Sequence, residues 1–161
     1  MINNLWFIDD LFEDEQYKKV IEYCFNAPYY FGEYDREDTL PTGMVSEISE
    51  DCEVYKLFES KIKEKVNAVK DLNLYRMYIN CFFPGENPYF HTDGETGITC
   101  LFYVNPQVNA DDGGSTQFLI GTDSINFLPI PNRLGVFDAN IMHRATSFRN
   151  KHRFTVAIKY K

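Results

Sequence analysis

Residues 153–160 read Arg-Phe-Thr-Val-Ala-Ile-Lys-Tyr and form the most regular alternating stretch of the sequence. Successive side chains of an extended chain point to opposite faces. The even-numbered positions are all apolar or aromatic, whereas Arg153, Thr155 and Ala157 share the other face. Lys159 is expected to point outward, where the strand frays. The pattern predicts a strand that packs its apolar face on helices and turns Arg153 and Thr155 into a barrel.

The sequence between residue 70 and this stretch has the same β character. Pro84-Gly85 and the Asn- and Gly-rich residues 109–114 are turn signals that separate short strand-like runs. Many short strands with turns between them predict a sandwich or a barrel. The expected strands are 72–83, 97–105, 115–120, 124–128 and 134–137.

The first 70 residues are expected to supply helical support for this β-rich part. A short strand at 5–8 precedes a helix that begins behind the acidic residues 13–15. A second helix has an apolar stripe from Val54 to Val69. Residues 26–50, with two prolines and two glycines, are expected to be irregular. The predicted class is mainly β with supporting helices (α+β).

Composition limits the possible functions. The 161 residues predict a single domain, 1–161, with helical support in 1–70 and a β-rich core in 71–161. Sixteen basic against 24 acidic residues give a net charge of −8, which opposes broad nucleic-acid binding. A signal peptide and a membrane-spanning segment are not expected, so we predict a cytoplasmic protein without a membrane partner. The four cysteines form no C-x-x-C motif and are expected to be reduced thiols, mostly buried.

Three residues suggest a metal site. His91 and Asp93 are two positions apart, so in an extended segment both point to the same side. His143 lies further along, after an expected strand and turn. Two histidines and one carboxylate are the ligands of non-haem Fe(II) oxygenases, in which the protein occupies one face of the metal. Zinc bound by the same residues is the competing interpretation.

Arg153 suggests a second binding partner. A guanidinium that points into a barrel needs an anion, because an unpaired buried charge is costly. Arginine suits a carboxylate through two parallel hydrogen bonds, and the hydroxyl of Thr155 can add a third donor. The alternative is a surface arginine at the mouth of the strand. Together with the possible metal site, the carboxylate of a cosubstrate is the simpler explanation.

At this point the sequence resembles the Fe(II)- and 2-oxoglutarate-dependent dioxygenases, and most closely their prolyl 4-hydroxylase branch. The resemblance runs from about residue 72 to the C-terminus, and the ten-residue step from His143 to Arg153 is typical of that branch. It implies a double-stranded β-helix (jelly-roll) core with the N-terminal helices packed on one sheet. The resembling segments are 80–85, 91–93, 98–105, 113–114, 136–143 and 153–155.

The resemblance assigns roles to individual residues. His91, Asp93 and His143 would hold Fe(II), and 2-oxoglutarate would chelate the metal. The distal carboxylate of this cosubstrate would meet Arg153. O2 would be the oxidant, succinate and CO2 the coproducts, and ascorbate a reductant.

Four further positions would shape the cosubstrate site. Tyr103 and Thr155 would assist Arg153, and Asn80 falls where the related alkylation-repair dioxygenases place a cosubstrate-binding asparagine. Phe82 departs from the pattern, because many relatives carry a tyrosine there. Since phenylalanine cannot donate a hydrogen bond, cosubstrate binding would depend more on Tyr103.

The substrate is the least determined part of the prediction. Tyr78 and Arg76 share a strand face with Asn80 and are candidates for the pocket entrance, and Arg144 is a candidate for substrate contact. A prolyl residue in a peptide or protein is the substrate that the resemblance implies. A small molecule, another side chain or an alkylated base are alternatives, and so is a cupin-like module that binds metal or sugar without oxygenase activity.

Overall fold

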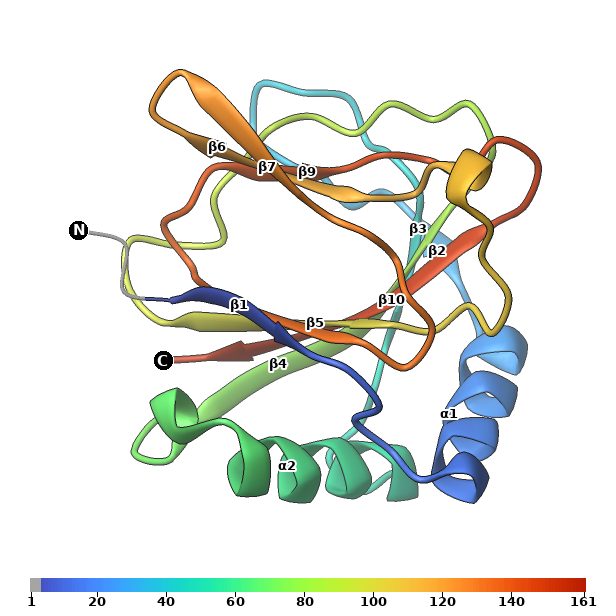
Figure 1. Ribbon diagram of the computed structural model, residues 1–161, viewed down its shortest axis with the longest axis vertical. Helices are drawn as coiled ribbons and strands as arrows, with labels where there is room; N and C mark the ends of the chain where they lie inside the picture. The colour runs from blue at the N-terminus through green and yellow to red at the C-terminus, as the bar shows by residue number, and fades with distance from the viewer. Residues whose placement is uncertain (1–3) are drawn as a thin grey trace.

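The computed structural model describes residues 4–161 and consists of two facing β-sheets with two helices outside the larger one (Figure 1). The larger sheet has seven strands in the order β1-β8-β5-β10-β4-β3-β2, and the smaller has three in the order β7-β6-β9. All pairs in both sheets are antiparallel. The mainly β architecture with supporting helices is confirmed.

The bounds of most expected elements are close to the predicted ones. The helices are α1 (Asp14–Asn26) and α2 (Glu53–Lys65), with short 3-10 turns η1 (Asn67–Val69) and η2 (Ala110–Asp112). The strands are β1 (Leu5–Ile8), β2 (Tyr30–Phe31), β3 (Met44–Glu47), β4 (Leu74–Phe82), β5 (Ile98–Tyr103), β6 (Thr116–Ile120), β7 (Asp123–Phe127), β8 (Leu134–Asp138), β9 (His143–Ala145) and β10 (Arg153–Tyr160).

The two helices cover the outer face of the larger sheet, as Figure 1 shows. A capping box between Glu13 and Gln16 satisfies backbone donors at the start of α1. The rings of Phe12, Phe58 and Phe102 then meet edge to face, with centroids 5.0 to 5.3 Å apart. These contacts join the chain before α1, the centre of α2 and strand β5 into one apolar core.

A second, smaller core lies between the two sheets. Phe118 of β6 contacts Phe127 of β7 and Phe137 of β8, with both pairs of centroids 4.9 Å apart. This core also includes Tyr103 and Ala157 from the larger sheet.

Residues 26–50 are more regular than the sequence suggests. They contain β2 and β3, and β3 adds to the larger sheet by pairing with β4, with Val45 opposite Asn80. Val45 and Ser46 are buried. The proline and glycine content hid this strand, because a four-residue strand is stabilised by pairing with a distant neighbour and not by its own composition.

The cysteines agree with the expectation of free, mostly buried thiols. All four cysteines are free, and Cys24, Cys81 and Cys100 are buried. Within residues 4–161, neither helix has the length and apolar character that a membrane span requires.

The aromatic contacts beneath the sheet make a stability prediction. Replacing the fully buried Phe58 with alanine leaves a cavity between α2 and β5, and we expect the free energy of unfolding to fall by about 3–5 kcal/mol. Urea unfolding measures the change. Leu40→Ala, at a side chain that is 74% exposed, is the control and should change it by less than about 0.5 kcal/mol. Equal effects of the two substitutions would contradict the assigned core.

Candidate metal centre and cosubstrate pocket

A cavity of about 240 Å³ lies between the two sheets. The odd-numbered residues of β10 form one wall: Arg153, Thr155, Ala157 and Lys159. The alternation predicts this position for the first three of them. The even-numbered Val156 and Ile158 belong to the core under the helices. The wall opposite β10 includes His143 and Thr116 from the smaller sheet. The cavity therefore lies where the sequence places it.

The backbone brings the three predicted metal ligands together. His91 and His143 form an isolated antiparallel bridge in which each N–H donates to the carbonyl of the other at 2.9 Å. The N–H of Asp93 donates to the carbonyl of Ala139 at 2.8 Å. Two segments that are 50 residues apart in the sequence are thus held in one fixed register.

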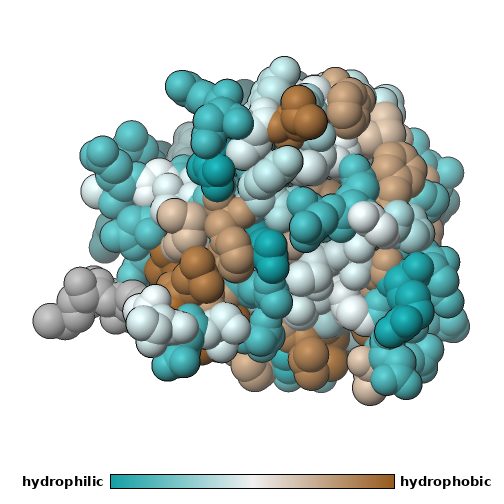
Figure 2. Space-filling view, turned by 90° about the horizontal axis from the view of Figure 1, so that it is seen from above, coloured by the Kyte–Doolittle hydropathy of each residue, from teal (hydrophilic) through white to brown (hydrophobic). Residues whose placement is uncertain are grey.

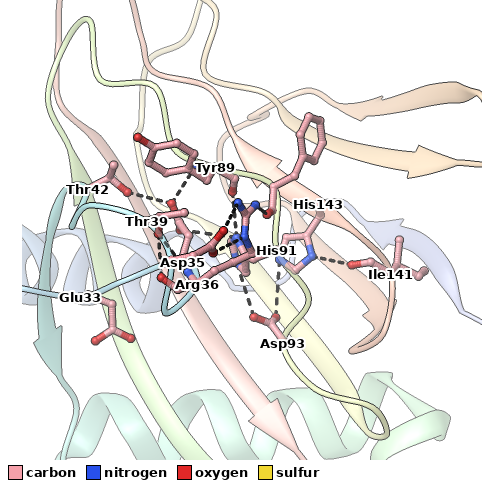
Figure 3. A network of polar contacts seen from close by, with 12 residues as sticks. Glu33, Asp35, Arg36, Thr39, Thr42, Tyr89, His91, Asp93, Ile141 and His143 are labelled. Atoms are coloured by element: carbon pink, nitrogen blue, oxygen red, sulfur yellow. Dashed lines mark hydrogen bonds and ion pairs between the residues drawn. The ribbon is translucent and has the colours of Figure 1, made fainter.

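The side chains of this triad converge on one point. Nε2 of His91 lies 3.7 Å from Oδ1 of Asp93, and Nε2 of His143 lies 3.6 Å from Oδ2. One ligand atom from each residue lies within 4.8 Å of the others. Figure 3 shows both imidazoles turned toward the carboxylate of Asp93. A divalent cation fits at the point where these three side chains meet.

Hydrogen bonds select the ring nitrogen that faces this point. Nδ1 of His91 lies 3.0 Å from the carbonyl of Tyr89, and Nδ1 of His143 lies 2.8 Å from the carbonyl of Ile141. A carbonyl is an acceptor, so each Nδ1 carries the proton and each Nε2 keeps a lone pair for a metal. Burial also lowers the pKa of His143, which favours the neutral, ligating form at pH 7.

Both carboxylate oxygens of Asp93 have a donor. The Thr99 hydroxyl donates to Oδ2 at 2.6 Å, and the Lys159 ammonium donates to Oδ1 at 2.9 Å. Burial alone would raise the pKa of Asp93, but the two imidazoles, Lys159 and Thr99 lower it below the ordinary value. Asp93 is therefore ionised, as a metal ligand must be.

The prediction for Lys159 was wrong. It does not point to solvent at a frayed end, because β10 continues to Tyr160 and keeps its alternation between β4 and β5. The side chain of Lys159 is 12% exposed and lies in the cavity wall. The cause is the register with β4 and β5, which extends the inward-facing row by one more residue.

Arg153 lies elsewhere in the same cavity wall and is 1% exposed. Its Nε donates to the carbonyl of Gly114 at 2.8 Å, and its Nη2 donates to the Thr116 hydroxyl at 2.9 Å. Within residues 4–161, no carboxylate forms an ion pair with it. Burial lowers the pKa of Arg153 to about 10, an effect that Tyr103 only partly offsets. The guanidinium is thus buried with neutral partners and lacks a counter-ion.

The other predicted cosubstrate residues surround Arg153. The Thr155 hydroxyl accepts a long hydrogen bond from it, at 3.4 Å. Asn80 and Phe82 of β4 line the cavity, with Phe82 directly opposite Arg153 in the register. Tyr103 of β5 pairs with Thr155 in the register, and its hydroxyl donates to Thr116 at 2.7 Å. Thr116, which the sequence analysis missed, is the residue that connects Tyr103 to Arg153.

The three substrate candidates have different positions. Tyr78 lines the cavity. Arg76 does not, because it forms ion pairs with Glu33 and Glu47 and lies over the ring of Tyr78. Arg144 is also outside the cavity wall. Its Nε donates to Oε1 of Gln117, and its guanidinium lies 4.3 Å from the ring centroid of Phe90.

The segment between β2 and β3, residues 32–43, adds a further wall to the cavity. Asp35 accepts hydrogen bonds from the Tyr89 N–H at 2.8 Å and the Thr42 hydroxyl at 3.0 Å, and lies 3.4 Å from Nδ1 of His91. Arg36 donates to the carbonyl of Phe90 at 2.6 Å. Figure 3 shows this segment against the His91 side of the triad. Seen from above relative to Figure 1, the surface of the molecule mixes hydrophobic patches with hydrophilic side chains (Figure 2).

Compared by sequence, the chain matches no family model and none of the curated proteins. Compared by structure, it is similar to a Trichoplax adhaerens prolyl hydroxylase in complex with a hypoxia inducible factor peptide fragment, at a TM-score of 0.79 and 18% identity. It is also similar to a Pseudomonas putida prolyl-4-hydroxylase, at a TM-score of 0.80 and 12% identity. A viral collagen prolyl hydroxylase from Paramecium Bursaria Chlorella virus-1, in its 2-oxoglutarate complex, has a TM-score of 0.70 and 13% identity.

These similarities extend over nearly the whole chain. Each comparison covers 98% of this chain, and 83%, 92% and 96% of the three structures in that order. They establish that the chain has the double-stranded β-helix fold found in 2-oxoglutarate- and Fe(II)-dependent oxygenases. The expected jelly-roll core with helices on one sheet is therefore confirmed.

The geometry of the triad predicts which histidines bind a metal. We expect His143→Ala to abolish Mn²⁺ binding, because one of three ligands is removed. Binding is measured by electron paramagnetic resonance, in which the signal of free Mn²⁺ decreases as the ion binds. His152 is the matched control, since it is exposed and lies nine residues away in the sequence. His152→Ala should bind Mn²⁺ as the unchanged protein does. Equal binding by the two variants would exclude His143 as a ligand.

Proposed function

We propose that this protein is an Fe(II)- and 2-oxoglutarate-dependent dioxygenase that hydroxylates an aliphatic C–H bond. The observation that carries the proposal is the uncompensated guanidinium of Arg153 in the cavity that also contains the His91, Asp93 and His143 triad. A buried charge without a partner is costly, so the fold is expected to gain stability when an anion binds there. A dicarboxylate that also reaches a metal satisfies both features.

The residues present fit this pair of ligands. His91, Asp93 and His143 would hold Fe(II), with both Nε2 atoms and an ionised carboxylate facing one point. When bound, the metal and 2-oxoglutarate would supply the O2-dependent oxidation, with succinate and CO2 as coproducts. A zinc site with the same ligands does not account for Arg153. Ascorbate as a reductant and a cytoplasmic location remain parts of the proposal.

The protein residues would position the cosubstrate and exclude water. Arg153 would bind its distal carboxylate, with its side chain already oriented by Gly114 and Thr116. Gly114 has a φ of +77°, and a Cβ there would collide with the ring of Phe148, so only glycine places its carbonyl in this way. Phe82 contributes an apolar wall without a donor. Because the guanidinium is oriented before the ligand binds, little ordering is needed on binding.

A prolyl residue in a peptide is the substrate that we propose. One structural neighbour is a prolyl hydroxylase in complex with a peptide fragment. In this chain, Tyr34 and Pro88 are part of the cavity wall, and Tyr34 is 57% exposed. Exposed Tyr89 follows Pro88 in the sequence. Aromatic rings at the mouth of a cavity suit a flat, apolar prolyl ring.

A small molecule or another side chain is the second candidate for the same chemistry. The cavity of about 240 Å³ and its polar groups would admit one small side chain or metabolite. An alkylated base is less consistent with the net charge of −8, because nucleic-acid readers carry a basic track. A cupin-like module that binds sugar would leave Arg153 without a reason to be buried.

Cosubstrate turnover tests the reaction class. We expect succinate to form from 2-oxoglutarate when Fe(II) is present, and Arg153→Leu to weaken cosubstrate binding by about 2–5 kcal/mol because it removes the charged partner. The exposed Arg149 provides the control variant, Arg149→Leu. Equal turnover by the unchanged protein and His143→Ala would reject the proposed centre.

Peptide mass spectrometry tests the substrate. Incubation with Fe(II), 2-oxoglutarate and ascorbate should add one oxygen atom to proline-containing peptides. An absence of added oxygen across a broad peptide library, while succinate still forms, would reject the prolyl substrate and retain the reaction class. The same mixture with small-molecule candidates then tests the second candidate.

A further inference from the structure

Lys159 is a buried cation that the proposed reaction does not require. It is the last inward-facing residue of β10, and its side chain is 12% exposed. Its Nζ lies 2.9 Å from Oδ1 of Asp93 and 5.2 Å from the ring centroid of Tyr78. Its ammonium forms an ion pair with the carboxylate that would bind the metal.

The other contacts of Asp93 already orient its carboxylate. The Thr99 hydroxyl holds Oδ2 at 2.6 Å, and the Asp93 N–H donates to the carbonyl of Ala139. An additional neutral donor would be enough to complete this arrangement. What Lys159 adds beyond a hydrogen bond is a full positive charge.

That charge opposes a divalent cation. A metal bound to Asp93 would lie within a few ångströms of Nζ, because Oδ1 is 2.9 Å from Nζ and 3.7 Å from Nε2 of His91. Two positive charges at such a distance repel strongly in a partly buried site, where water screens them poorly. In the absence of a metal, the same charge compensates Asp93 and removes the cost of an isolated buried carboxylate.

Groups near Lys159 do not remove this conflict. Tyr78 is buried beside it, and Arg76, which pairs with Lys159 in the register of β4 and β10, has its guanidinium carbon 3.9 Å from the centroid of that ring. Arg76 is itself paired with Glu33 and Glu47. In the described part of the chain, Asp93 is the carboxylate that forms an ion pair with Lys159.

We propose that Lys159 is a positioning residue that acts as a built-in counter-cation for Asp93. It holds the triad in order before a metal binds, and it lowers the affinity for the divalent ion by competing for Oδ1. The inference rests on the metal centre of the proposed function. Its consequence is a site that stays folded without metal and releases metal more readily than the three ligands alone would.

Lys159→Gln separates charge from hydrogen bonding, because the amide can still donate to Asp93. We expect Mn²⁺ to bind this variant on the order of tenfold more tightly, measured by electron paramagnetic resonance. Without metal, its melting temperature should be lower than that of the unchanged protein, and Mn²⁺ should raise it by a larger increment. Lys159→Arg keeps the charge and should keep the original affinity.

Lys151→Gln is the matched control. The Nζ of Lys151 forms an ion pair with Asp112 at a distance of 2.7 Å, and neither residue lines the cavity. It should leave Mn²⁺ affinity unchanged. If Lys159→Gln does not fold, Lys159→Met serves in its place, and the same increase in Mn²⁺ affinity is expected. Unchanged or weaker Mn²⁺ binding by the folded neutral variant would overturn the role of Lys159. Failure of the unchanged protein to bind Mn²⁺ would instead overturn the metal centre.

Discussion

Strand β10 lies in the middle of the larger sheet, hydrogen-bonded to β5 on one side and to β4 on the other, and both halves of the structure depend on it. Its even-numbered side chains pack under α1 and α2, and its odd-numbered ones line the cavity. A shift of one residue in this register would exchange the two sets. Burial of Val156 and Ile158 therefore keeps Arg153 in the cavity.

The smaller sheet contributes the complementary constraint. The bridge between His91 and His143 joins the segment before β5 to β9 through two hydrogen bonds of the backbone. Each imidazole is then oriented by a carbonyl at Nδ1. The orientation of the two imidazoles thus depends on main-chain contacts.

Buried charge gives the cavity its chemical character. Arg153 is surrounded by neutral acceptors and needs an anion, whereas Lys159 already has one in Asp93. The two cations lie on the same face of one strand, six residues apart, so they are about 20 Å apart along the chain. They serve different partners, and only Arg153 is left with a charge that a ligand must compensate.

Local pattern was sufficient to predict the helices, most strands and the inward direction of Arg153 and Thr155, because alternation and helical spacing depend on near neighbours in the chain. The residues of the triad could also be selected from the sequence, since only three histidines are present. Strand β3 and the position of Lys159 could not. Each is held by a partner far away in the sequence (β4 and Asp93), and such pairings form only when the chain has folded.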